Sequence, residues 1–137
     1  MDKMNVGWIG TGVMGLTVAE KIIDAGNTLT VYDVSSQAAE RAGGIGAQVG
    51  RSPAEVAKKS DIILLFLPGP KEIRECVASP DGLLSASKAG SVIADMSTSD
   101  PGTSMRMAEY AGKKDVGYLD APVLGRPITV GNWALPV

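Results

Sequence analysis

Hydrophobic residues in this chain alternate between short unbroken runs and stretches with helical spacing. The apolar runs Val6–Ile9 and Leu29–Tyr32 stop at Gly10 and Asp33, as buried strands commonly do. Between the two runs, apolar side chains recur every four residues and mark one face of a helix; they are Met14, Val18 and Ile22. The start of the chain is therefore predicted to be a strand–helix–strand unit.

The second half of the chain continues the alternation with clearer boundaries. Ser52, Pro53 and Glu55 form a capping-box pattern, which predicts a helix that runs to about residue 59. The run Ile62–Leu67 is uniformly apolar and stops at Pro68, so we expect a strand covered on both faces, within a parallel sheet. Further helices are predicted over 36–42, 71–77 and 101–111, and further strands over 47–49, 91–94 and 117–119.

Strands and helices in strict alternation predict an α/β fold with a doubly wound, mainly parallel sheet and right-handed crossovers. The length of 137 residues fits about one domain, which we assign to residues 1–137. The segment Pro122–Val137 is rich in proline and glycine and ends on an apolar stretch without a helix or cap. We therefore expect this domain to be incomplete at its C-terminal end.

Composition places the chain among ordinary globular proteins, since 45% of its residues are apolar and 20% are charged. No apolar run approaches the length of a membrane span, and the first residues lack the apolar core of a signal peptide. We therefore expect a cytoplasmic protein without a membrane partner. A net charge of −2 without a basic run argues against a nucleic-acid partner.

Missing residue types exclude several chemistries. The chain has no histidine, which excludes Ser–His–Asp hydrolysis, Cys–His catalysis and histidine-bound zinc. The lone cysteine, Cys76, excludes an intrachain disulfide and a four-cysteine metal site, so no metal site is predicted. The 17 glycines exceed the average usage of about 7%, which directs attention to tight turns and close backbone approaches.

Six consecutive residues match the pattern G-x-G-x-x-G directly after a predicted strand and at the start of a predicted helix. In a Rossmann-type fold the first glycine permits a sharp turn, the second admits a pyrophosphate, and the third lets helix and strand pack closely. Exposed N–H groups and the positive helix end then hold the phosphates. The residues expected to bind the dinucleotide here are Gly10, Thr11, Gly12, Val13, Met14 and Gly15.

Asp33 follows the second predicted strand, where an acidic residue can accept hydrogen bonds from ribose hydroxyls. The alternative is a solvated carboxylate in a loop. A carboxylate would repel the 2′-phosphate of NADP, and no arginine follows, since the next residues are Val34, Ser35 and Ser36. The expected cofactor is therefore NAD, with NADP disfavoured.

The run from Gly7 to Gly15 resembles the opening of the β-hydroxyacid dehydrogenase family, which includes 3-hydroxyisobutyrate and 6-phosphogluconate dehydrogenases. Later segments match the family in the same order. Leu67-Pro68 ends a main strand, residues 95–101 (DMSTSDP) are similar to its D-x-S-T-x-x-P segment, and residues 120–123 (DAPV) resemble the start of D-A-P-V-S-G-G. The resemblance covers essentially the whole chain.

This resemblance implies further roles. Leu67 and Pro68 would line the cofactor cleft, Thr98 would contact the cofactor near the nicotinamide, and Ser97 would bind the carboxylate of a small substrate. The alternative for Ser97 and Thr98 is capping of the helix that follows, although Asp100 can cap that helix itself.

The chain departs from the family after the D-A-P-V segment. Leu124 and Arg126 stand where the family has a serine and a second glycine, and Gly125 is retained between them. A guanidinium is a bidentate donor suited to carboxylates, so Gly125 and Arg126 are candidates for binding the substrate. The alternatives for Arg126 are an exposed surface position or an ion pair with Asp120.

The family's catalytic lysine belongs to a G-x-x-G-x-G-x-x-x-K-x-x-x-N segment on a helix beyond the dinucleotide domain, and no such segment occurs by Val137. The family's helical domain is also missing, so no catalytic residue is predicted. We expect the NAD-binding domain of an oxidoreductase that transfers hydride between a nicotinamide cofactor and a small β-hydroxy acid or its semialdehyde. By itself this domain should be close to inactive and should form homo-oligomers.

Two other interpretations stay open. The chain could be a stand-alone dinucleotide-binding or redox-sensing module without catalysis. It could also derive from an imine reductase or a 6-phosphogluconate type of enzyme, although imine reductases usually carry an Asn-Arg pair where Asp33 and Val34 stand.

Overall fold

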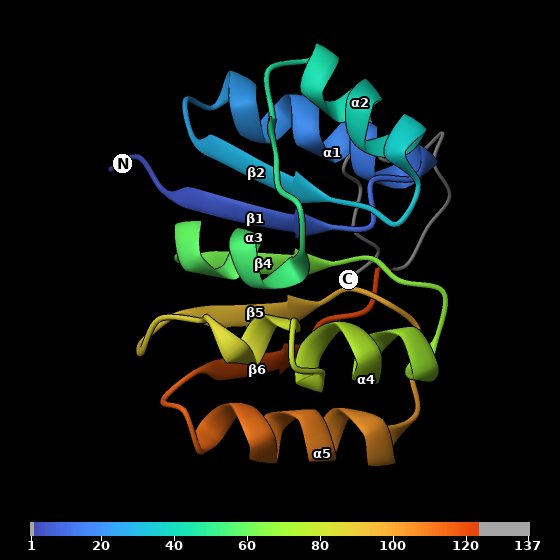
Figure 1. The fold of residues 1–137 in the computed structure, drawn as a ribbon, viewed down its shortest axis with the longest axis vertical. Coiled ribbons are helices and arrows are strands. Elements are labelled where there is room, and N and C mark those ends of the chain that lie inside the picture. Colours follow the sequence, from blue (N-terminus) through green and yellow to red (C-terminus); the bar gives the residue numbers. More distant parts are fainter. Residues whose placement is uncertain (1, 124–137) are drawn as a thin grey trace, which may run out of the picture.

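The computed structural model describes residues 2–123, apart from the side chains of Val13 and Met14, and contains a single six-stranded sheet. The strands are β1 (Asn5–Ile9), β2 (Thr28–Tyr32), β3 (Gln48–Val49), β4 (Ile62–Leu65), β5 (Val92–Asp95) and β6 (Gly117–Asp120). They pair in the order β3-β2-β1-β4-β5-β6, and every pair is parallel. Their arrowheads therefore point the same way in Figure 1, and their carboxyl ends share one edge.

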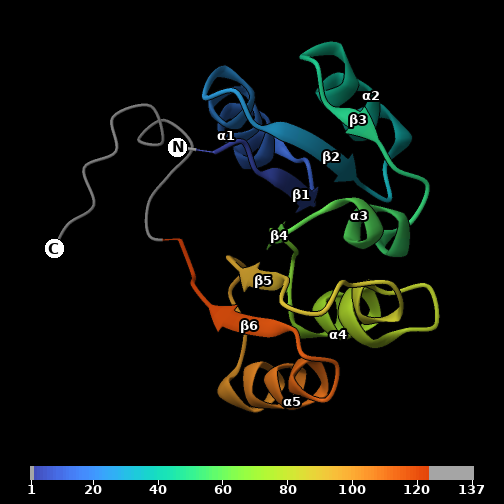
Figure 2. The same ribbon diagram turned by 90° about the vertical axis from the view of Figure 1, so that its left-hand side faces the viewer.

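Helices connect the strands and cover the sheet. They are α1 (Val13–Asp24), α2 (Ser36–Gly44), α3 (Pro53–Lys59), α4 (Pro70–Ala78) and α5 (Pro101–Gly112), with a short 3₁₀ helix η1 (Leu83–Ser85). Figure 2 shows α3 and α4 on the same side of the sheet. Within the described residues, no helix combines the length and apolar character needed to cross a membrane.

Two apolar clusters fill the space between sheet and helices. The first joins β1 and β2 to α1 and α2 and contains Val6, Trp8, Ala19, Leu29, Val31, Ala42 and Ala47. The second joins β4 and β5 to α3, α4 and α5 and includes Val56, Ile63, Leu65, Ile73, Val77, Ile93 and Met107. Successive side chains of β1 enter different clusters, as the two-residue period of a strand requires.

The alternating order of elements and the parallel doubly wound sheet are confirmed. Three details differ from the sequence prediction. The 3₁₀ helix η1 was not expected, β4 ends two residues early at Leu65, and only one face of β4 is fully covered within the described residues. Ile63 and Leu65 are fully buried, whereas Ile62 and Leu64 on the other face are half-buried. Uniform hydrophobicity alone could not tell these two faces apart.

The capping signals are confirmed with one change. The Ser52 hydroxyl accepts a hydrogen bond from the Glu55 N–H at 3.2 Å, and Pro53 occupies the first turn of α3. The Glu55 carboxylate reaches back to the N–H of Arg51, at 2.8 Å, instead of the N–H of Ser52 that a capping box would use. This hydrogen bond and the Lys59 ammonium lower the pKa of Glu55.

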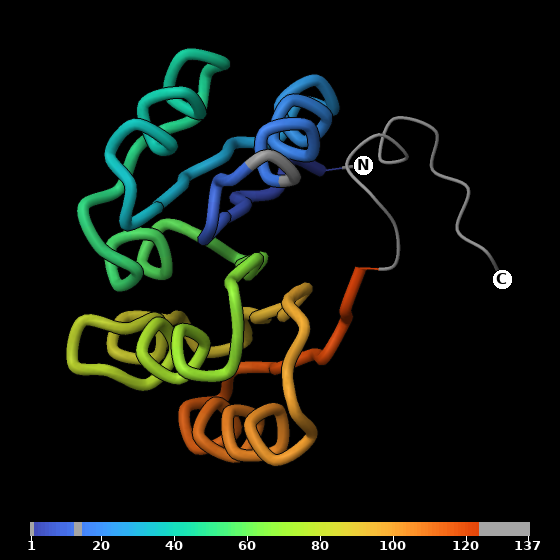
Figure 3. The backbone as a smooth tube through the Cα atoms, turned by 90° about the vertical axis from the view of Figure 1, so that its right-hand side faces the viewer, coloured from blue at the N-terminus to red at the C-terminus, as the bar shows by residue number. Residues whose placement is uncertain are grey.

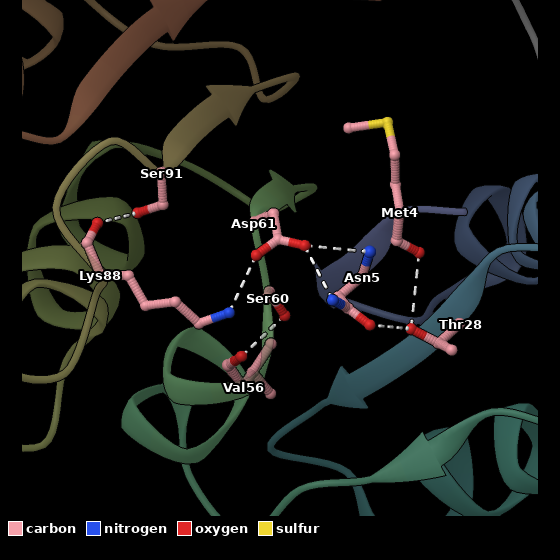
Figure 4. Close-up of polar contacts among 8 residues, drawn as sticks. All are labelled: Met4, Asn5, Thr28, Val56, Ser60, Asp61, Lys88 and Ser91. Carbon is pink, nitrogen blue, oxygen red and sulfur yellow. Dashed lines mark hydrogen bonds and ion pairs between the residues drawn. The ribbon is translucent and has the colours of Figure 1, made fainter. Parts of the chain in front are cut away.

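The amino ends of three strands are joined by polar side chains at the edge opposite the glycine-rich turn (Figure 4). Asp61, which precedes β4, accepts hydrogen bonds from the Asn5 side-chain amide at 2.8 Å and the Lys88 ammonium at 2.9 Å. Asn5 in turn accepts a 2.8 Å hydrogen bond from the Thr28 hydroxyl of β2. Lys88 and Asn5 lower the pKa of Asp61, so this network favours the charged carboxylate.

Replacing Asp61 should therefore make the free energy of unfolding less dependent on pH in the acidic range. A carboxyl whose pKa is lower in the folded chain adds stability above its unfolded pKa of about 3.9 and loses it as the pH falls. We expect Asp61→Asn to cost about 0.2–1 kcal/mol at pH 7, because solvent screens exposed pairs, and less near pH 3. Urea unfolding at both pH values measures this, with the exposed Glu40→Gln as control. A cost for Asp61→Asn that is equal at both pH values would contradict the prediction.

Candidate functional site

A cleft of about 620 Å³ opens at the carboxyl ends of the central strands, where parallel α/β sheets place their ligands. Its volume lies within the range of small-molecule sites. The described residues that line it are Ile9, Gly10, Gly12, Tyr32, Asp33, Val34, Pro53, Phe66, Leu67, Pro68, Glu72, Glu75, Cys76, Ser79 and Asp81. Five of the predicted cofactor residues thus line the cleft, together with residues of α4 and of the loop after β2; the five are Gly10, Gly12, Asp33, Leu67 and Pro68.

The three glycines of the turn between β1 and α1 occupy different environments. Gly10 has a φ of +91°, and a Cβ there would collide with the backbone carbonyl of Phe66. A Cβ on Gly15 would lie 2.8 Å from the Gly10 carbonyl oxygen. Among the described residues, no heavy atom lies within 4 Å of the corresponding position on Gly12, which faces open space there. Gly10 and Gly15 are required by packing, whereas Gly12 leaves room for a ligand.

Thr11 and Asp33 connect the glycine-rich turn to the end of β2. The Thr11 N–H donates a 2.7 Å hydrogen bond to Asp33 Oδ2, and the Ser35 N–H donates at 2.8 Å to Oδ1. Thr11 is 1% exposed, so it faces Asp33 and not the cleft. Figure 3 shows how the backbone leaves β1 and enters α1 at this point. Since each carboxylate oxygen has two lone pairs, Asp33 can still accept a ligand hydroxyl.

Ser97 and Thr98 follow β5 but differ in exposure. Ser97 is 3% exposed, and its hydroxyl oxygen accepts a hydrogen bond from the Leu67 N–H at 2.8 Å, while Thr98 is exposed. Neither residue caps α5, because Asp100 accepts the Thr103 N–H at 2.8 Å. Ser97 thus supports the cleft wall at Leu67 from behind and retains its own hydroxyl proton for donation.

A buried carboxylate lies behind that wall. Asp95 is 1% exposed and accepts hydrogen bonds from the Tyr118 hydroxyl at 2.7 Å and the Ser97 N–H at 3.0 Å. Burial and the bond to Asp95 raise the pKa of Tyr118. Burial, together with the charge of Asp95, raises the pKa of the Cys76 thiol to about 12. The thiol is therefore protonated at neutral pH and is not an activated nucleophile.

Sequence reasoning missed the wall that α4 contributes. Glu72, Glu75, Cys76 and Ser79 all line the cleft. Their spacing of three, four and seven residues places them on one helical face, and this pattern was available in the sequence. It escaped notice because the four side chains share no single chemistry.

Other predicted residues lie away from the cleft or outside the described chain. Gly125 and Arg126 lie outside the described residues, as does Leu124. The lysines expected to face solvent are exposed; they are Lys58, Lys71, Lys88 and Lys113. Within residues 2–123, no three histidine, cysteine or acidic side chains cluster as metal ligands would.

Comparison with known proteins gives consistent matches along the chain. Residues 5–132 match the family described as the NAD binding domain of 6-phosphogluconate dehydrogenase. The 2-(hydroxymethyl)glutarate dehydrogenase of Eubacterium barkeri is 37% identical over 126 residues, which are 91% of this chain and 42% of that protein. The mitochondrial 3-hydroxyisobutyrate dehydrogenase of Mus musculus is 38% identical over 124 residues, 90% of this chain and 37% of the relative.

A solved structure supports the same grouping. The 3-hydroxyisobutyrate dehydrogenase of Mycobacterium tuberculosis, solved with L-serine, superposes with a TM-score of 0.86 at 25% identity. The match covers 93% of this chain and 43% of that one. The chain thus spans about two fifths of the length of the relatives it matches.

Proposed function

Because the chain belongs to the family of NAD-binding domains typified by 6-phosphogluconate dehydrogenase, we propose that its cleft binds NAD(H) in preference to NADP(H). In this proposal residues 1–137 are the cofactor domain of a dehydrogenase of the 3-hydroxyisobutyrate type. The observation that carries it is the open space at Gly12 within the same cleft as Asp33. A pyrophosphate needs the open space at Gly12, and a ribose without a 2′-phosphate needs the Asp33 carboxylate.

The residues present fit such a cofactor. Gly12 and the amino end of α1, with Val13 and Met14 in its first turn, would receive the pyrophosphate. Asp33 would accept the ribose hydroxyls, while Leu67 and Pro68 would form the apolar wall of the adenosine half. NAD supplies the hydride acceptor of the reaction, and the protein supplies position and electrostatics.

The family resemblance supports the proposal that Ser97 binds a small carboxylate and that Thr98 lies near the nicotinamide. Arg126, where the chain departs from the family, would bind the same carboxylate through its bidentate guanidinium, beside the retained Gly125. We further propose that the lysine for proton transfer and the helical domain belong to a part of the parent enzyme beyond this chain. The chain alone would then turn over slowly, since losing a general acid–base costs about 10²–10⁴-fold in rate.

Two further parts of the proposal concern the whole protein. We propose that it forms homo-oligomers, in keeping with the half-buried apolar face of β4 that Ile62 and Leu64 share. A cytoplasmic location also stays a prediction, and several of the relatives are named as mitochondrial proteins. The stand-alone binding module is the second candidate, and a continuing reading frame beyond Val137 would decide against it.

Isothermal titration with NADH and NADPH tests the cofactor proposal directly. We expect NADH to bind at least about tenfold more tightly, because each unfavourable charge contact of about 1.4 kcal/mol costs a factor of ten. The charged side chains among the described lining residues are all acidic; they are Asp33, Glu72, Glu75 and Asp81. If NADPH bound more tightly than NADH, the proposed preference would be overturned. If neither nucleotide bound, the proposed function would be overturned.

A further inference from the structure

Trp8 of β1 contacts the backbone of the glycine-rich turn as well as the apolar core. The side chain is 1% exposed, and its indole Nε1–H donates a 2.8 Å hydrogen bond to the carbonyl oxygen of Gly10. Packing against the first apolar cluster does not require this N–H, because a hydrophobic ring would fill the same space. The indole N–H therefore holds the Gly10 carbonyl, which a purely apolar side chain could not do.

The other end of the same peptide group is also held by a side chain. The Gly10 carbonyl and the Thr11 N–H belong to one planar trans unit, so they point in opposite directions. Thr11 N–H donates to Asp33 Oδ2 at 2.7 Å. The Gly10–Thr11 peptide is thus fixed between Trp8 of β1 and Asp33 after β2.

This peptide needs such support because one of the two backbone bonds about which it can rotate belongs to a glycine. Gly10 has a φ of +91°, and a residue without Cβ has little steric resistance to turning the adjacent peptide over. A reversed peptide would withdraw the Thr11 N–H from Asp33 and turn the Gly10 carbonyl oxygen toward the carboxylate side. The partial negative charge of that oxygen would then face the Asp33 carboxylate and repel it, displacing the group proposed to hold the ribose.

We propose that Trp8 is a positioning residue for dinucleotide binding, whose indole N–H locks the Gly10–Thr11 peptide in the orientation that holds Asp33 in place for the ribose. Gly15 belongs to the same arrangement, since a Cβ there would lie 3.0 Å from the indole nitrogen and displace it. The affinity effect rests on the proposed function, whereas the peptide lock itself is a property of the unliganded chain.

Trp8→Phe removes the donor and keeps an aromatic ring in the core. We expect NADH to bind about three- to tenfold more weakly, the usual effect of one lost hydrogen bond, and AMP, which keeps the adenosine ribose, to lose a similar factor. Val6→Ala is the matched control, because Val6 is buried in the same cluster but lies near the amino end of β1, whereas the turn follows its carboxyl end. It should lower the melting temperature without changing the affinity for NADH.

Hydrogen exchange at the Thr11 amide, followed by NMR, gives a second readout that needs no ligand. Exchange should be faster in Trp8→Phe and unchanged in Val6→Ala. Unchanged Thr11 exchange in a folded Trp8→Phe chain would overturn the proposal, as would unchanged NADH affinity. If the unaltered chain binds no NADH, the proposed function fails. The exchange rate of the Thr11 amide alone then tests whether Trp8 locks the peptide. Should Trp8→Phe not fold, β-(3-benzothienyl)alanine at position 8 keeps the bicyclic shape without the N–H.

Discussion

Gly12→Ala is expected to leave the chain folded while lowering its affinity for NADH at least about tenfold. Gly12 has a φ of −60°, which any L-residue adopts, and a Cβ there would meet no atom of residues 2–123 within 4 Å, the undescribed side chains of Val13 and Met14 aside. The added methyl group would occupy the space that the pyrophosphate needs for contact with the backbone. Isothermal titration gives the affinity, and thermal unfolding confirms that the fold is intact.

Gly10→Ala separates this effect from damage to the turn. At Gly10 the φ of +91° and the collision of a Cβ with the Phe66 carbonyl both oppose a side chain. This variant should lose several degrees of melting temperature as well as affinity, whereas Gly12→Ala should lose affinity alone. Normal NADH binding by Gly12→Ala would show that the pyrophosphate does not approach this glycine.

Sequence reasoning succeeded where the physical signal is local. Apolar periodicity and capping residues such as Ser52 and Asp100 report nearest-neighbour preferences, so the helices and strands were predicted in the right order. The motif residues Gly10 to Gly15 were recognised from the spacing of the three glycines between a predicted strand and a predicted helix. The cleft position of Asp33 followed from the rule that ligands bind at the carboxyl ends of parallel strands, and that of Leu67 and Pro68 from the family resemblance.

Contacts between distant segments could not be predicted in the same way. Thr11 was expected to bind the dinucleotide, but its N–H is occupied by Asp33, which is 22 residues away. The Ser97 hydroxyl accepts the N–H of Leu67, 30 residues earlier, because β4 and β5 are neighbours in the sheet. Register and rotamer decide such pairs, and neither is encoded in a short motif.

Asp33→Asn should weaken NADH binding about tenfold or more and raise the affinity for NADPH relative to NADH. The amide loses the negative charge and presents N–H groups on the side where Asp33 accepts from Thr11 or Ser35. Acceptors for the ribose hydroxyls are lost, and so is the repulsion of a 2′-phosphate. Titration of both nucleotides against the variant gives the two affinities and their ratio.

Asp81→Asn is the matched control for charge alone, because Asp81 lines the same cleft without joining the glycine-rich turn. If the ribose interaction decides the preference, this variant should change the NADPH-to-NADH ratio much less than Asp33→Asn does. Equal shifts in the two variants would instead assign the preference to the summed negative charge of the cleft, and Asp33 would then act on the turn through Thr11 alone. The two variants therefore distinguish direct recognition of the cofactor from the general electrostatics of its cleft.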